Sequence, residues 1–198
     1  IKPVVVLKAG RGSGSPRAAR THSGTLIVND QIYAAAMRRA GAVRVRSFVE
    51  LFSAAKCLAS RYRPVGKRLG IITNGGGPGV LAADYVNEPG LQLGVLSPDS
   101  ARALAPLLAP AASLADLMDL TEFATAEHYA AALDAAAKDR ALDGVLAIYS
   151  PKFDGDPEGV AQALVQIRPN MAKPLVACWM GDSSVLTARH ALAEAQIP

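Results

Sequence analysis

Residues 69–84 read LGIITNGGGPGVLAAD, an apolar run followed by a glycine-rich turn and then by a helix-forming stretch. This order predicts a buried strand of a parallel sheet that enters a helix through a tight turn. Glycines let the backbone turn sharply and approach a ligand closely, and Pro78 fits the first turn of a helix. The rest of the fold is worked out from this strand–turn–helix unit.

The alternation of strand and helix continues to the end of the chain. We expect helices over residues 78–88, 99–108, 125–139, 157–167 and 183–194, between strands over 69–73, 91–96, 117–120, 145–149 and 175–179. Strands separated by helices of this length predict an α/β fold. Its form is a doubly wound, flavodoxin-like parallel sheet with helices on both faces.

The first sixty residues contain fewer elements. We expect two strands there, over residues 4–7 and 43–45. We also expect two helices, one capped by Asn29 or Asp30 that runs to about Ala40 and one that begins at Ser47. These four elements are too few for a domain. The periodicity breaks at residues 61–66. We therefore predict that residues 1–63 are the C-terminal part of a similar domain and that residues 64–198 form a second flavodoxin-like domain. Both chain ends are expected to be internal to a longer protein.

The composition indicates which classes of molecule the chain is expected to bind. The 198 residues are 51% hydrophobic and 19% charged, with a net charge of +4. The arginines cluster without the interleaved aromatics that stack nucleic-acid bases, so anionic small molecules such as phosphates or CoA are favoured over nucleic acid. No apolar run or signal peptide indicates a membrane. Cys57 and Cys178 lack metal-site spacing, and we expect buried free thiols in a reducing, cytoplasmic compartment.

The glycine-rich turn is the first candidate site. Free N–H groups and the dipole at a helix N-terminus attract anions, so Asn74, Gly75, Gly76, Gly77 and Gly79 are candidate phosphate-binding residues. The spacing matches neither a dinucleotide fingerprint nor a P-loop. A tight turn without a ligand is the alternative.

The second candidate is a histidine loop. His22 lies among Thr21, Ser23 and Gly24, with Arg17 nearby. A neutral imidazole can accept a phosphoryl group, and arginines with backbone amides can hold phosphate oxygens. Considered alone, such a histidine is more often an ordinary surface residue. The other candidates, His128, His190 and the carboxylates of residues 152–157, are weaker, and no metal site is predicted.

Three ordered stretches of this chain, residues 2–11, 17–24 and 73–84, closely resemble the NDP-forming acyl-CoA synthetases, which are relatives of succinyl-CoA synthetase. The resemblance extends through residues 173–181 and so covers nearly the whole chain. It implies a ligase that converts acyl-CoA, phosphate and a nucleoside diphosphate into carboxylate, CoA and a nucleoside triphosphate. His22 matches the phosphorylated histidine, and the Gly75–Gly79 turn matches a phosphate-facing helix N-terminus.

The resemblance also implies partners. A CoA-binding domain and an ATP-grasp domain, in the same or a partner chain, would hold acyl-CoA, CoA and ATP/ADP or GTP/GDP with Mg. This fragment is not expected to be active alone, and a homodimer is possible. One departure is at residues 116–120: the family usually has Asn-Pro-x-Asp-Leu there, and this chain has Asp-Leu-Met-Asp-Leu.

One alternative function remains open at this stage. Residues 51–56, followed by Arg63-Pro64 and the glycine-rich turn, also resemble bacterial protein acetyltransferases in which a ligase-like region is fused to an N-acetyltransferase domain. In those proteins the region senses acyl-CoA or is degenerate. An FMN-binding flavodoxin is disfavoured, because a Ser/Thr-rich phosphate loop and stacking aromatics are missing.

Overall fold

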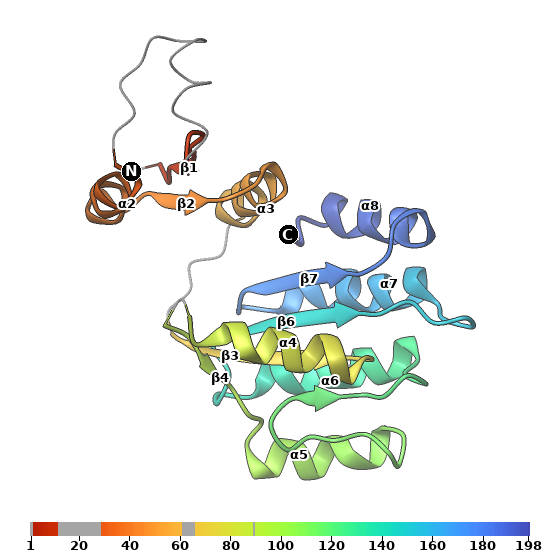
Figure 1. The fold of residues 1–198 in the computed structure, drawn as a ribbon. Helices are drawn as coiled ribbons and strands as arrows, with labels where there is room; N and C mark the ends of the chain where they lie inside the picture. The colour runs from red at the N-terminus through yellow and green to blue at the C-terminus, as the bar shows by residue number, and fades with distance from the viewer. Residues whose placement is uncertain (1, 12–28, 61–65, 89) are drawn as a thin grey trace. The chain divides into compact units, whose positions relative to one another are not determined.

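The computed structural model describes residues 2–11, 29–60, 66–88 and 90–198 (Figure 1). The chain divides into two compact units, residues 1–60 and 61–198, and each is described by itself. Within the described residues, no helix is long and apolar enough to cross a membrane.

The first unit contains two parallel strands and two helices. Strand β1 (Val5–Leu7) pairs in parallel with β2 (Val43–Val45), and helix α2 (Asp30–Arg39) connects them. Helix α3 (Phe48–Ala59) follows. The predicted caps are present, because Asn29 accepts a hydrogen bond from Gln31 N–H and Ser47 accepts one from Glu50 N–H.

The second unit alternates strand and helix throughout. Its strands are β3 (Arg68–Thr73), β4 (Gln92–Leu93), β5 (Met118–Asp119), β6 (Gly144–Tyr149) and β7 (Leu175–Trp179). Its α-helices are α4 (Gly76–Val86), α5 (Pro98–Leu104), α6 (Ala126–Lys138), α7 (Pro157–Ile167) and α8 (Leu186–Glu194). The 3₁₀ turns Ala105–Leu107, Arg168–Asn170 and Ser183–Val185 extend α5 and α7 and precede α8.

All five strands of the second unit pair in parallel. The order is β4-β3-β6-β7, and the short β5 pairs with β3 on the same side as β4 but further along, at Ile72 and Thr73. The chain therefore winds in one direction from β3 to β4 and β5, then in the other direction to β6 and β7. This doubly wound α/β topology confirms the predicted fold class, and it creates a switch point between the carboxyl ends of β3 and β6.

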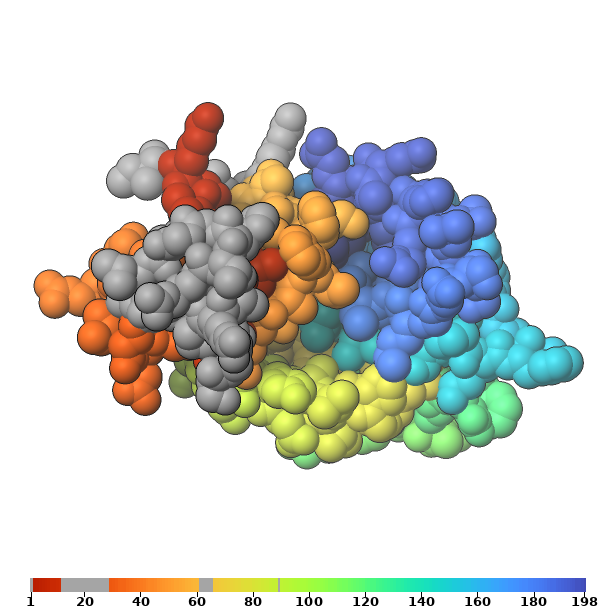
Figure 2. Space-filling view, turned by 45° about the horizontal axis from the view of Figure 1, so that its top comes forward, coloured from red at the N-terminus to blue at the C-terminus, as the bar shows by residue number. Residues whose placement is uncertain are grey.

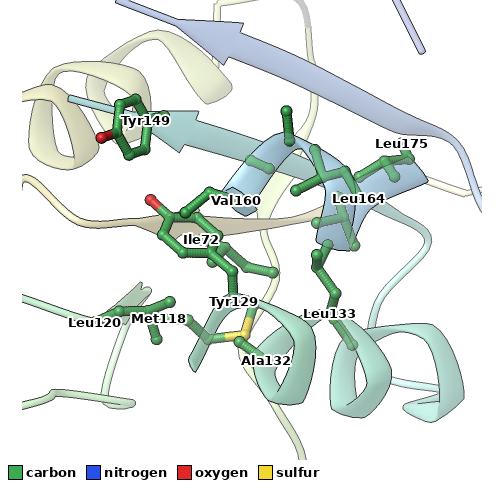
Figure 3. Close-up of a cluster of buried hydrophobic side chains, with 14 of the residues drawn as sticks. Ile72, Met118, Leu120, Tyr129, Ala132, Leu133, Tyr149, Val160, Leu164 and Leu175 are labelled. Atoms are coloured by element: carbon green, nitrogen blue, oxygen red, sulfur yellow. The ribbon is translucent and has the colours of Figure 1, made fainter. Parts of the chain in front are cut away.

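The two faces of this sheet are covered unequally. The main core lies between one face and helices α5 to α8, where Tyr129 and Leu133 of α6 approach Val160 and Leu164 of α7 over Ile72 (Figure 3). On the opposite face, α4 packs its Val86 against Ile71 and Ile148. In the described part of the chain, α4 is the helix that covers this second face, and its outward side, with Val80, Leu81 and Tyr85, is exposed (Figure 2).

Two sequence-based expectations are corrected. The thiols of Cys57 and Cys178 are exposed rather than buried. Cys57 lies on α3, in which no residue is buried, and Cys178 shares the β6–β7 surface of the α4 face with Ile148. The strand expected over residues 91–96 is reduced to Gln92–Leu93, because β3 exchanges β4 for β5 as its neighbour after Leu69.

A buried carboxylate links the end of α6 to the start of α5. Asp139, which is 5% exposed, accepts hydrogen bonds from the N–H groups of Ser97 (2.7 Å) and Ala141 (2.8 Å). Burial alone would raise the pKa of Asp139, but these N–H groups and the Ser97 and Ser100 hydroxyls outweigh it and lower the pKa to about 2. Lys173 donates to the carbonyls of Ala136 and Asp139 and so caps the end of α6.

The depressed pKa of Asp139 predicts an acid-dependent loss of stability. The stabilisation is present above the ordinary pKa of 3.8 and is lost as the pH falls towards about 2. Asp139→Asn should lower the free energy of unfolding at pH 7 by about 2 kcal/mol and remove this dependence. Urea unfolding followed by the fluorescence of Trp179, the single tryptophan, measures it. Asp134→Asn, which breaks only an exposed pair with Lys138, is the control and should change little.

Candidate functional site

The carboxyl ends of β3 and β6 are joined by one side chain. Asn74, 2% exposed, accepts a hydrogen bond from Ser150 N–H at 2.7 Å, and its amide nitrogen donates to the Ser150 carbonyl at 2.9 Å. These two bonds link the chains that leave β3 and β6, as a further backbone pair of the sheet would. Asn74 therefore fixes the spacing of the two strands at the switch point, where ligands bind in open α/β sheets.

The glycine-rich turn follows Asn74 directly. The Thr73 hydroxyl accepts from Gly75 N–H (3.0 Å) and donates to the Gly75 carbonyl (2.9 Å), which fixes the turn. Helix α4 begins at Gly76, two residues earlier than predicted, and Pro78 lies in its first turn as expected. The first helical hydrogen bond shown at this end runs from Gly79 N–H to the Gly75 carbonyl.

The N-terminus of α4 is not capped. Gly75 occupies the N-cap position and offers no side chain, so the N–H groups of Gly76 and Gly77 precede the first helical hydrogen bond without a side-chain acceptor. Unpaired N–H groups and the aligned peptide dipoles place partial positive charge at this point. The geometry suits an oxyanion that would accept from both N–H groups.

Three of the four glycines have close neighbours at the position that a Cβ would take, and Gly79 has the least room. An added Cβ would lie 2.8 Å from the Thr73 methyl carbon at Gly79, 3.0 Å from Ser150 Oγ at Gly75 and 3.2 Å from Asp119 Oδ2 at Gly76. At Gly77 an added Cβ would meet nothing within 4 Å. The sequence alone did not separate these roles, because Ser150 and Asp119, the neighbours of Gly75 and Gly76, lie far from the turn in the sequence.

Asp119 is a site residue that sequence reasoning did not include among the candidates. It ends β5, and its Oδ1 accepts from Thr121 N–H at 3.0 Å, while Oδ2 faces Gly76. A carboxylate here interacts favourably with the empty helix N-terminus and repels a bound anion. The signal that could have found it was its position at the carboxyl end of a predicted strand, in a loop that the family resemblance had already singled out.

The backbone beside Asp119 is strained. Thr121 has φ 68°, a left-handed conformation that a β-branched side chain rarely adopts. Its hydroxyl is buried and makes no hydrogen bond with the rest of the described structure. Such strain concentrates at functional sites, and here it lies at the same edge of the sheet as the uncapped helix.

The other half of the predicted site has no described geometry. Arg17, Thr21, His22, Ser23 and Gly24 all lie outside the described residues. The structure therefore brings together Asn74, Gly75, Gly76, Gly77 and Gly79 and says nothing about the placement of the histidine loop.

The weaker candidates have structural explanations. His128 is the third residue of α6, and its Nδ1 accepts from Thr125 N–H in a capping box. His190 is exposed on α8. Asp156 caps α7 by accepting from Gly159 N–H at 2.7 Å. Across the described ranges, no group of three or more His, Cys, Asp or Glu residues is arranged to hold a metal ion.

Comparison with known proteins shows which proteins the chain is similar to. Residues 1–58 match the family described as "Succinyl-CoA ligase like flavodoxin domain". Over 197 residues, all of this chain, it is 34% identical to the ADP-forming acetate–CoA ligase I of Archaeoglobus fulgidus. The chain is similar to the succinyl-CoA synthetase-like, ADP-forming acyl-CoA ligases.

Further relatives show the same similarity. The alpha subunit of an ADP-forming acetate–CoA ligase II from Pyrococcus furiosus is 32% identical over the full chain. An acetyl-coenzyme A synthetase from Ca. Korarchaeum cryptofilum, solved with phosphate and ADP, superposes with a TM-score of 0.87 at 31% identity over 99% of this chain. The chain spans 28% of the Archaeoglobus ligase, 44% of the Pyrococcus subunit and 43% of the Korarchaeum chain, so it corresponds to a part of these ligases.

The glycine contacts predict opposite effects of the same substitution within one turn. Gly79→Ala should destabilise the second unit by about 1–3 kcal/mol, because the new methyl group overlaps the Thr73 side chain. Gly77→Ala should be neutral or stabilise by up to about 1 kcal/mol, since alanine favours a helix and has open space there. Urea unfolding of the two variants measures the difference, and equal effects would contradict the packing around Thr73.

Proposed function

We propose that this chain is the phosphoryl-relay part of an NDP-forming acyl-CoA ligase. In this function the enzyme converts acyl-CoA, phosphate and a nucleoside diphosphate into carboxylate, CoA and a nucleoside triphosphate, and His22 carries the phosphoryl group between two sites. The observation that carries the proposal is the uncapped, glycine-rich N-terminus of α4 at the sheet's switch point. The ligases similar to this chain support it by their named activity.

The relay divides the work between the two units. Residues 1–63 would be the end of one succinyl-CoA ligase-like flavodoxin domain, which carries His22. Residues 64–198 would be a second such domain, whose Asn74 and glycines 75, 76, 77 and 79 face the phosphoryl group. Arg17, Thr21, Ser23 and Gly24 would hold its oxygens from the histidine side.

The chemistry requires little of the α4 turn beyond placement and charge. A neutral imidazole nitrogen of His22 attacks the phosphorus of an acyl phosphate, and the carboxylate leaves with the electrons of the broken P–O bond. Two backbone N–H groups and a helix dipole stabilise the phosphoryl oxygens by about 0.3–2 kcal/mol, which aids transfer without driving it. In the next step the phosphohistidine transfers the phosphoryl group to a nucleoside diphosphate.

Other domains complete the enzyme. A CoA-binding domain and an ATP-grasp domain, in the same or a partner chain, would hold acyl-CoA, CoA and the nucleotide with Mg, and the assembly would work in the cytoplasm. The relative from Pyrococcus, named as an alpha subunit, supports a need for such partners. The acetyltransferase-fused alternative rests only on the resemblance of residues 51–56, Arg63-Pro64 and the glycine-rich turn.

Phosphorylation of His22 can be tested directly. The full-length enzyme that contains this chain, incubated with ATP labelled at the γ-phosphate, should acquire one acid-labile, alkali-stable label per active site. His22→Ala should abolish the label, because the proposal assigns the phosphoryl group to His22 alone. His190→Ala, at an exposed helix position, is the control and should keep it. A wild-type enzyme without label, or a labelled His22→Ala variant, contradicts the relay.

The charge of Asp119 gives a second test of the anion site. Asp119→Asn removes a negative charge next to Gly76 while keeping the side chain's shape. The affinity of the enzyme for inorganic phosphate should rise about fivefold or more, as expected for loss of a nearby like charge. Isothermal titration measures it, with Asp116→Asn, in the same loop, as the matched control. An unchanged affinity would place the bound phosphate away from the α4 N-terminus.

A further inference from the structure

Three cations surround one carboxylate in the first unit. Asp30 Oδ1 contacts Arg44 Nη2 at 2.5 Å and Lys8 Nζ at 3.5 Å. Asp30 Oδ2 lies 3.9 Å from Arg11 Nε. The hydrogen bond from Arg44 lowers the pKa of Asp30, so this carboxylate is charged at neutral pH. One negative charge among three positive charges leaves the cluster with a surplus of two positive charges.

The acidic residues of this unit are too few to neutralise the surplus. Residues 1–60 contain ten Lys or Arg residues but two acidic residues, Asp30 and Glu50. Glu50 lies in the first turn of α3, where its carboxylate accepts a hydrogen bond from Arg46 N–H. The cluster around Asp30 therefore has a positive potential that the other side chains of its unit reinforce rather than cancel.

Two of the cations are held in fixed positions. The Lys8 ammonium and the Arg44 guanidinium both lie over the ring of Tyr33, at 5.4 and 5.7 Å from its centroid, and such contacts stabilise cations. Their side chains are 14% and 19% exposed. Arg44 also donates to the Asp30 carbonyl at 3.4 Å. Because these groups are already ordered, a ligand that binds them loses little free energy to the ordering of side chains.

Arg11 and Asp30 form the accessible side of the cluster. Their side chains are 36% and 34% exposed. The distance of 3.9 Å between Arg11 Nε and Asp30 Oδ2 is too long for a hydrogen bond, so the guanidinium can turn towards a ligand. Lys8 directly follows β1, and Asp30 is the first residue of α2. The dipole at this helix N-terminus adds to the attraction for an anion.

We propose that Lys8, Arg11 and Arg44 form a binding site for a phosphate dianion. Phosphate carries about two negative charges at neutral pH, which balances the surplus of the cluster. Guanidinium and ammonium groups form strong, charge-assisted hydrogen bonds to phosphate oxygens. The ligand is inorganic phosphate or the terminal phosphate of an organic ester, and the experiment below separates the two. This site lies in the other unit from the α4 turn and does not depend on the proposed relay.

Chemical labelling of Lys8 in the full-length protein tests the site. Acetylation of Lys8 by acetic anhydride, followed by mass spectrometry, should slow about fivefold or more at saturating phosphate, because a bound anion shields the amine and favours its protonated, unreactive form. Chloride at the same ionic strength should protect Lys8 much less. Lys138, whose pair with Asp134 is exposed in the second unit, is the internal control and should react at an unchanged rate.

Matched variants separate a phosphate site from a general effect of charge. Arg11→Gln should raise the phosphate concentration that half-protects Lys8 about five- to tenfold, since it removes one cation next to the ligand. Arg11→Lys keeps the charge and should recover most of the affinity. Arg39→Gln removes the same charge from the last turn of α2, roughly 14 Å from Asp30 at the usual helical rise, and should change little.

Two further ligands identify the source of the phosphate. CoA and dephospho-CoA differ by the 3′-phosphate, so stronger protection of Lys8 by CoA assigns the site to an ester phosphate. Protection by inorganic phosphate alone assigns it to the free ion. The site is wrong if phosphate leaves the Lys8 rate unchanged or if chloride protects equally. It is also wrong if Arg39→Gln shifts the half-protecting concentration as much as Arg11→Gln does.

Discussion

The reciprocal pair of hydrogen bonds between Asn74 and the backbone of Ser150 is the constraint on which the second unit's site depends. It joins the two residues that directly follow β3 and β6. Without it, Ser150 would no longer be held beside Gly75, and the start of α4 would no longer have a fixed place at the switch point. An apolar residue of the same size would leave the Ser150 N–H and carbonyl unpaired, which is costly where they are shielded from water.

Asp119 and Thr121 apply a second constraint from the other side of β3. The pairing of β5 with the last two residues of β3 carries Asp119 to the edge where α4 begins. Asp119 accepts a hydrogen bond from the N–H of Thr121, and Thr121 itself has a left-handed backbone conformation. The site thus contains an attractive helix terminus and a repulsive carboxylate within one small volume. In the proposed relay, this combination would let a phosphate be both held and released, as a reversible reaction requires.

Much of this was predictable, and the limits have physical reasons. Local signals placed α7 and its Asp156 cap, the Ser47 cap and the β3–turn–α4 unit, since each depends on residues adjacent in sequence. The contacts of Asn74 with Ser150 and of Gly76 with Asp119 join residues far apart in the chain, so periodicity could not reveal them. Exposure of Cys178 depends on which helices cover a sheet face, which composition does not specify.

The helices of the second unit differ in whether a side chain caps their N-terminus. Helices α5, α6 and α7 each begin with a side chain, from Ser97, Thr125 and Asp156, that accepts a backbone N–H. A serine at Gly75 would add about 1 kcal/mol of the same stabilisation. However, its Cβ would crowd Ser150, and its hydroxyl would occupy the N–H groups that an oxyanion needs. The missing cap therefore costs stability at a turn whose free N–H groups would serve the proposed anion site. Helix α8 also lacks a side-chain cap, but it continues directly from the 3₁₀ turn Ser183–Val185.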